Sequence, residues 1–155
     1  MSGLYFRSKL TYAEAFAAPP PAMASVYVIT PGENLRRADQ PTHLARLRRF
    51  AEVDIDLEDV RHDRPLQRDV RRLAAELATE GELVQLGSVA TTKYVDPLLE
   101  ILGERLRFPS DFVGRGDMSR GVLLRCVRNG RELTYVPVAG AARRGSRPPR
   151  LGPLR

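Results

Sequence analysis

The sequence predicts an α/β protein, a small three-layer α/β/α domain with a mainly parallel sheet. Short apolar, β-branched runs alternate with longer segments whose apolar residues recur at helical spacing. Strands separated by helices in this way form parallel sheets that helices cover on both faces. With 155 residues, 43% of them hydrophobic and 28% charged, the chain is long enough to bury one core. We therefore expect a single α/β domain over residues 1–139.

The first part of the chain predicts two helices and one strand. Residues 4–17 carry apolar side chains at helical spacing and run into three consecutive prolines, which end a helix. Residues 25–30 are a short β-branched run, typical of a buried strand, and residues 31–41 form a turn-rich loop. A second helix is expected over residues 42–52. Residues 53–57 alternate in polarity, so they fit either a strand or an extended connection.

The middle of the chain continues the alternation of helices and strands. The clearest helix covers residues 63–79, because its apolar residues form one stripe and Gly81 follows as a stop signal. A strand over residues 83–86 comes next, followed by a helix over residues 94–102. Residues 106–109 are a possible third strand.

The last part of the chain is ambiguous at Asn129–Gly130. This pair between two apolar runs indicates a hairpin, but it also ends helices, and Ser119 is a suitable N-cap. We favour a helix over residues 119–128 and a strand over residues 132–138. Residues 140–155 are rich in Arg, Pro and Gly, and we expect a disordered tail there.

The charge of the chain is uneven. The net charge is +6, and five of the 25 basic residues lie in the tail, which holds no acid. The remaining 20 basic and 19 acidic residues make the body nearly neutral. Within the body, residues 105–131 have a local charge of +5, with seven arginines against two aspartates. A basic end of this kind can orient a protein on a polyanion.

Several classes of protein are excluded by what the sequence lacks. Cys126 is the only cysteine, so an internal disulfide and a multi-cysteine metal site are excluded, and a buried thiol is expected. His43 and His62 have no partner at metal-ligand spacing, and no phosphate-loop or dinucleotide fingerprint occurs. No apolar run is long enough to span a bilayer, and the first residues do not have the pattern of a signal peptide. We expect a cytoplasmic protein that binds no metal, no cofactor and no membrane.

Three polar loops follow the predicted strands, at residues 30–34, 87–93 and 108–120. Because the carboxyl ends of parallel strands meet at one edge of a sheet, we expect a binding site where these loops converge. In the first loop, Glu33 could act as a general base or electrostatic stabiliser, and Glu33 and Asn34 could orient a water or read a base edge, although turn chemistry alone also explains them.

The second and third loops suit an anion. In the second, Gly87, Ser88 and Lys93 suit an anion at a helix N-terminus, and an ordinary capped turn is the alternative. The third loop mixes arginine, serine and glycine with apolar residues, a composition that suits phosphate contacts and wedging between bases. Its alternative is a charged surface loop whose phenylalanines turn into the core.

The order of segments over residues 83–136 resembles the C-terminal half of the uracil-DNA glycosylase superfamily. In that family a buried strand ends in a Leu-Gly-type turn, a second strand ends in a His-Pro-Ser motif, and an Arg/Gly/Ser loop and a leucine-rich helix follow. The matching residues are Leu86-Gly87-Ser88-Val89-Ala90, Phe108-Pro109-Ser110, Gly114-Arg115-Gly116-Asp117-Met118-Ser119-Arg120 and Leu123-Leu124. Phe108 stands where the family usually has histidine, and the family's Gly-Gln-Asp-Pro-Tyr motif is missing. The superfamily also resembles bacterial anti-phage glycosylases that remove modified bases.

The resemblance implies a protein that flips a modified base out of duplex DNA and cleaves its N-glycosidic bond. Glu33 or Asp117 would stabilise the sugar cation or position water, and Met118 or Phe112 would fill the vacated stack. Ser88, Ser110 and Ser119 would compress the DNA backbone, and Arg115 and Arg120 would neutralise phosphates. Together with these residues, the candidate interface contains Asn34, Gly87 and Lys93. The alternatives are a non-catalytic nucleic-acid-binding module and a nucleoside or nucleotide hydrolase or transferase.

Overall fold

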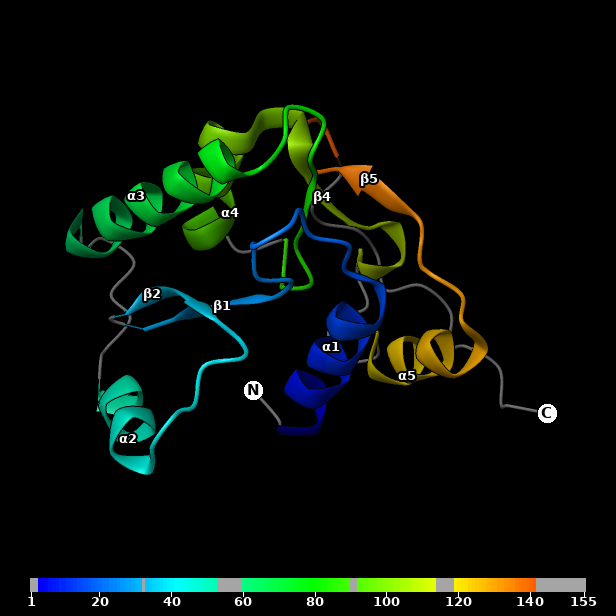
Figure 1. Cartoon of the computed structure of the whole chain (residues 1–155), viewed down its shortest axis with the longest axis horizontal. Coiled ribbons are helices and arrows are strands. Elements are labelled where there is room, and N and C mark those ends of the chain that lie inside the picture. The colour runs from blue at the N-terminus through cyan, green and yellow to red at the C-terminus, as the bar shows by residue number, and fades with distance from the viewer. Residues whose placement is uncertain (1–2, 32, 53–59, 90–91, 114–118, 142–155) are drawn as a thin grey trace.

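The structure is a computed structural model, and it describes residues 3–31, 33–52, 60–89, 92–113 and 119–141. It confirms a mixed α/β protein (Figure 1). The elements in chain order are α1 (Gly3–Phe16), β1 (Tyr27–Thr30), β2 (Asn34–Arg37), α2 (Leu44–Glu52), α3 (Val60–Glu76), β3 (Leu83–Val84), α4 (Thr92–Leu102), η1 (Gly103–Arg105), β4 (Leu106–Pro109), η2 (Ser110–Phe112), α5 (Ser119–Asn129) and β5 (Tyr135–Pro137). The predicted strand or connection at residues 53–57 and most of the predicted tail lie outside the described residues.

The strands of the described ranges form two small sheets. One is the antiparallel hairpin β1–β2, in which Ile29 lies opposite Leu35. The other has the order β3-β4-β5, with β3 parallel to β4 and β4 antiparallel to β5. Since only one of these three strand pairs is parallel, the predicted mainly parallel sheet is not confirmed.

The hairpin corrects the prediction of a loop over residues 31–41. Asn34 adopts a left-handed backbone with φ of 55°, a conformation that asparagine tolerates better than most residues, and the chain turns back on β1 there. The hydroxyl of Thr30 donates a hydrogen bond to the Asn34 carbonyl at 3.2 Å. The first predicted strand therefore pairs with the segment that follows it and does not join β3 and β4.

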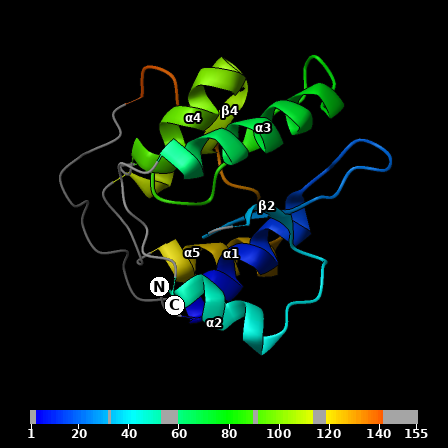
Figure 2. The ribbon, with the colours of Figure 1, turned by 90° about the vertical axis from the view of Figure 1, so that its left-hand side faces the viewer.

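The helices pack in two pairs. α1 packs against α5 and α3 packs against α4, and the two pairs lie on opposite sides in Figure 2. The buried core between them draws on α1, α3, α4, β4 and α5. It consists of Tyr12, Leu66, Val70, Val89, Val95, Leu98, Leu102, Leu106, Phe108, Phe112, Leu123 and Val138. β4 supplies three of the largest fully buried side chains, those of Leu106, Phe108 and Pro109, so the apolar residues of this segment anchor the sheet.

The ambiguity at Asn129–Gly130 is resolved in favour of the helix. α5 runs to Asn129, and Gly130 follows with φ of 59°. The N–H of Arg131 donates to the Cys126 carbonyl at 2.9 Å, and the N–H of Gly130 donates to the Val127 carbonyl at 3.2 Å. This pair of bonds satisfies the last carbonyls of a helix that ends in glycine. The hairpin alternative is wrong because these bonds cap a helix.

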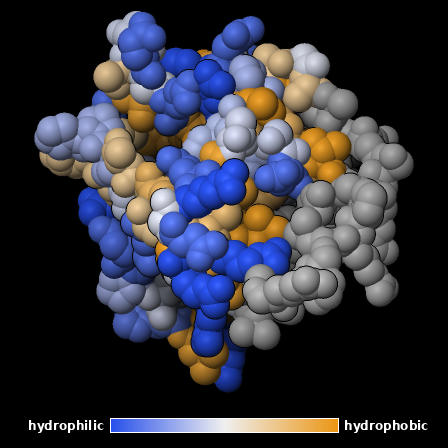
Figure 3. Space-filling model, turned by 90° about the vertical axis from the view of Figure 1, so that its right-hand side faces the viewer, coloured by the Kyte–Doolittle hydropathy of each residue, from blue (hydrophilic) through white to orange (hydrophobic). Residues whose placement is uncertain are grey.

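The described part of the face in Figure 3 is mostly polar. Hydrophilic side chains cover most of the face drawn in Figure 3, and apolar side chains show between them. Among the residues whose burial is described, the exposed large apolar side chains are those of Phe6, Leu44, Leu47 and Leu124. Among the described helices, none is long and apolar enough to cross a membrane.

Candidate functional site

Two of the three predicted site loops leave the same edge of the sheet. β3 and β4 are adjacent and parallel, with Val84 opposite Arg107, and the N–H of Gln85 extends the pairing by donating to the Arg107 carbonyl at 2.7 Å. Gly87 and Ser88 follow β3, and Ser110 follows β4. The third loop, at residues 30–34, belongs to the separate β1–β2 sheet.

Gln85 is a candidate site residue that the sequence pattern did not indicate. Its Nε2 lies 3.4 Å from the Ser88 carbonyl, to which it donates. Its Oε1 is buried and accepts no hydrogen bond from any described residue. A methyl group on Gly87 would lie 3.3 Å from Gln85 Nε2, so glycine leaves room for this amide. A buried acceptor without a donor is costly, and such groups concentrate where a ligand or water supplies the missing hydrogen bond.

The segment after β4 divides into a core part and a surface part. Phe108 and Phe112 belong to the core, as the alternative reading of this loop expected. Ser110 is exposed, and its hydroxyl and N–H both donate to the Thr134 carbonyl, at 3.4 and 3.1 Å. Ser110 is therefore held at the surface by the residue that precedes β5, whereas Phe112 packs inside.

The remaining predicted residues of the two loops are placed only in part. The backbones of Lys93 and of Ser119 and Arg120 begin α4 and α5. Arg115, Asp117 and Met118 lie outside the described residues, so their roles stay predictions.

Glu33 lies in the hairpin turn and is surrounded by arginines. Its Oε2 accepts a hydrogen bond of 2.5 Å from Nη1 of Arg36, and its Oε1 lies 3.0 Å from Nε of Arg46 and 3.9 Å from Nη2 of Arg49. The hydrogen bond from Arg36, aided by the charges of the other two arginines, lowers the pKa of the Glu33 carboxyl. Glu33 is thus a fixed negative charge and a weak proton acceptor.

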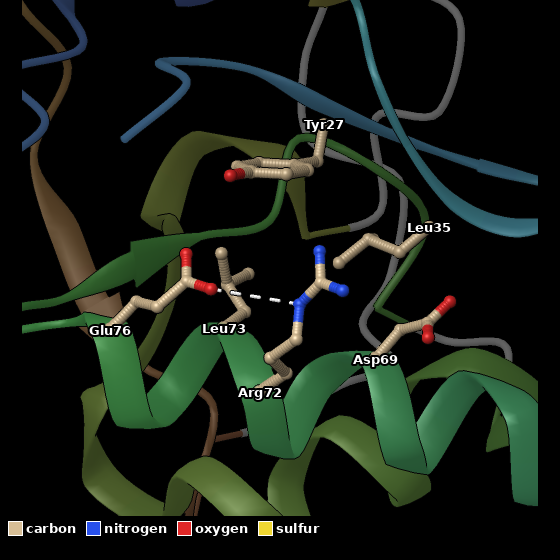
Figure 4. Close-up of a pocket in the computed structure, with 6 residues that line it drawn as sticks. All are labelled: Tyr27, Leu35, Asp69, Arg72, Leu73 and Glu76. Atoms are coloured by element: carbon tan, nitrogen blue, oxygen red, sulfur yellow. Dashed lines mark ion pairs between the residues drawn. The ribbon is translucent and has the colours of Figure 1, made fainter. Parts of the chain in front are cut away.

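The two faces of the hairpin contact different helices. Side chains alternate along paired strands, so Tyr27 and Leu35 share one face and Arg36 lies on the other. The Tyr27 face and α3 enclose a small open pocket, which is also lined by Asp69, Arg72, Leu73 and Glu76 (Figure 4). The Arg36 face carries the contact with Glu33 and, through it, with α2.

The pocket beside α3 is partly occupied by its own side chains. The guanidinium of Arg72 projects between Tyr27 and Leu35, and its Nε lies 3.6 Å from Oε1 of Glu76 (Figure 4). The lining of the pocket combines two carboxylates, one guanidinium and an aromatic ring, and this mixture favours no single class of ligand.

A pair of tyrosines, the buried Tyr12 and the half-buried Tyr135, joins α1 to β5. The hydroxyl oxygens of Tyr12 and Tyr135 are 2.7 Å apart, and the N–H of Leu133 donates to the Tyr12 hydroxyl at 2.8 Å. Burial raises the pKa of Tyr12, and burial together with hydrogen bonds to Tyr12 and Glu132 raises the pKa of Tyr135 well above its usual value. Both phenols therefore stay protonated and serve as structural hydrogen-bonding groups.

The described residues offer no metal centre and no activated thiol. No group of three His, Cys, Asp or Glu side chains among them is arranged to hold a metal ion. Cys126 is half-buried, and burial raises the pKa of its thiol, so the reactive thiolate is disfavoured.

The comparisons with known proteins add no family to this geometry. Protein-family models, curated proteins and solved structures give no match to this chain.

Proposed function

We propose that this protein binds duplex DNA and excises a modified base by cleaving the N-glycosidic bond. The observation that carries the proposal is the parallel pairing of β3 and β4. Because of this pairing, the segments that contain Gly87, Ser88 and Ser110 leave the sheet at the same edge. These residues belong to two of the four segments that carry the resemblance to the glycosylase superfamily. The proposal includes the three-layer α/β/α frame and a cytoplasmic location.

In the proposed mechanism the extruded base occupies the β3–β4 edge. The unpaired Oε1 of Gln85 is a ready acceptor for an N–H group of that base. Glu33 is engaged by three guanidiniums, which favours Asp117 as the carboxylate that stabilises the sugar cation or positions water. Arg115 and Arg120 contact phosphates, and Met118 fills the stack that the base leaves.

The test is a panel of duplexes that each carry one modified base. We expect an abasic site in at least one duplex, detected as strand cleavage in alkali. Asp117→Asn is expected to abolish product while leaving duplex affinity within about threefold, since the contacts to phosphates and base edges remain. Gln85→Leu is expected to weaken excision more than duplex binding. A panel that yields no abasic product contradicts the enzymatic part of the proposal.

A second candidate is a nucleic-acid-binding module without catalysis. Two observations favour it: Phe108 is apolar and 1% exposed where the resembling family has histidine, and Glu33 is already neutralised by arginines. In that case duplex binding is retained, and it weakens as salt rises, but no abasic product forms. Turnover of free nucleosides or nucleotides without duplex binding contradicts both candidates.

A further inference from the structure

Three arginines converge on one carboxylate between the hairpin and α2. We propose that Glu33, Arg36, Arg46 and Arg49, named here the hairpin cluster, form a contact for the phosphate backbone of DNA, with Glu33 as its internal counter-ion. The inference rests on the proposed binding of duplex DNA and adds a second contact surface away from the β3–β4 edge.

Among the described residues, the charges of the cluster do not balance. Three guanidiniums against one carboxylate leave a net charge of +2 there, and the exposed Arg48 on α2 adds to it. An exposed pair of opposite charges contributes little to stability, so a surplus of cations around one acid is not explained by folding alone. Like charges held this close repel one another, and a further anion relieves that repulsion.

The hydrogen-bonding capacity of the cluster is also in excess. Each guanidinium carries five N–H donors in a planar fork, whereas one carboxylate offers about four acceptor positions. Nε of Arg46 is buried and lies near Glu33 outside hydrogen-bonding geometry, and no described residue accepts from it. The planar forks match phosphate oxygens in pairs, and this geometry distinguishes arginine from lysine as a phosphate ligand.

The exposure of the cluster suits a backbone more than a small enclosed anion. The side chain of Arg36 is 13% exposed, which fixes one guanidinium, whereas that of Arg49 is 68% exposed and reaches solvent. The cluster is thus anchored at the hairpin and open along α2. A phosphate of a passing strand can meet the exposed Arg49 first, on a helix whose Leu44 and Leu47 are also exposed.

The experiment measures how duplex affinity depends on salt in the full chain. An unmodified fluorescent duplex of about 20 base pairs is titrated by anisotropy at several salt concentrations, because each neutralised phosphate contributes about −0.9 to the slope of log K against log salt. Arg49→Gln is the main variant, since Arg49 is exposed and its contact with Glu33 is long. Arg71→Gln is the matched control, an equal charge change at an exposed arginine of α3 that donates to Gln67.

We expect Arg49→Gln to make the slope shallower by about 0.9 and to weaken binding roughly eightfold at 0.1 M salt. Arg71→Gln is expected to leave the salt slope and the duplex affinity at their wild-type values within error. Glu33→Gln removes the counter-ion and is expected to tighten binding several-fold. Thermal unfolding of each variant reports whether the fold is retained. If Glu33→Gln detaches α2 from the hairpin, Arg46→Gln provides a second test of the cluster.

The outcomes separate this inference from the proposed function. If the wild-type chain binds duplex and Arg49→Gln and Arg46→Gln behave like Arg71→Gln, the hairpin cluster is not a backbone contact, while DNA binding stands. If the wild-type chain does not bind duplex at all, the proposed function fails, and the cluster is overturned as a DNA contact. A parallel titration with tripolyphosphate then distinguishes the source of the phosphate: binding that Arg49→Gln removes assigns the cluster to free phosphates instead.

Discussion

Replacing Tyr12 by phenylalanine tests how the first helix is tied to the end of the fold. The side chain of Tyr12 is 1% exposed, and its hydroxyl accepts from the N–H of Leu133 and pairs with the hydroxyl of Tyr135. Tyr12→Phe keeps the ring in the core but leaves both partners without this oxygen.

The magnitude follows from the two bonds. A buried polar group that loses its partner costs roughly 1–3 kcal/mol, and Tyr135 and Leu133 are each half-buried, so water recovers part of the loss. We expect the free energy of unfolding to fall by roughly 2–4 kcal/mol, which lowers the melting temperature of a chain of this size by roughly 6–12 °C.

The assay is chemical and thermal denaturation of the wild type, Tyr12→Phe, Tyr135→Phe and the double variant. The two single changes are expected to be non-additive, because each removes the same hydrogen bond. Tyr27→Phe is the matched control, since the Tyr27 ring lines the open pocket beside α3, and its expected change is within about 0.5 kcal/mol. A Tyr12→Phe variant as stable as this control would refute the assigned role of the tyrosine pair.

Three further predictions concern single residues. The pKa of Glu33 is lowered in the folded state, so its ion pairs stabilise the fold at pH values above the ordinary glutamate pKa of about 4.3. This stabilisation is lost as the pH falls through the lowered pKa. Glu33→Gln should therefore flatten the dependence of the denaturation midpoint on pH between about 5 and 3. Asn34→Ala should cost roughly 1–2 kcal/mol because of the positive φ, whereas Asn34→Gly should be nearly neutral, and equal urea midpoints for the two would contradict this. Phe112→Ala should lower the free energy of unfolding by roughly 3–5 kcal/mol, as for a core phenylalanine, and a loss of DNA affinity at unchanged stability would instead assign Phe112 to the interface.

The helices were predictable because their signals are local. α3, α4 and α5 lie where apolar residues repeat at helical spacing, and Gly130 ends α5 as a glycine cap should. The structure moves their boundaries by a few residues. α3 begins at Val60 and not at residue 63, and α4 begins at Thr92 and not at residue 94.

The hairpin was not predictable in the same way. β2 has the sequence Asn-Leu-Arg-Arg, with one apolar residue, so neither its composition nor its length marks a strand. It becomes a strand because β1 lies beside it, and pairing is a property of two segments. The same limit explains why the order of strands and loops in the sequence predicted the Thr30–Asn34 segment at the β3–β4 edge.

The candidate site was predictable only where it depends on one strand pair. Gly87, Ser88 and Ser110 follow two strands that the sequence pattern identifies, and these strands are adjacent in the structure. The hairpin cluster was missed because Arg46 and Arg49 are more than ten residues from Glu33 in the sequence. The local net charge along the sequence also gave no sign of the cluster, because the acidic run at residues 52–63 directly follows these arginines and offsets their charge.

The contact of α1 with α5 and the β5 segment has a consequence for how the chain is made. More than a hundred residues separate Phe16 from Ser119, and the tyrosine bond spans 123 positions. At roughly 5–20 residues per second on the ribosome, α1 emerges about 5–20 s before its packing partner. Until α5 has emerged, a nascent chain of this protein therefore exposes the apolar side of α1, and its core closes only after the segment from α5 to β5 has left the ribosome.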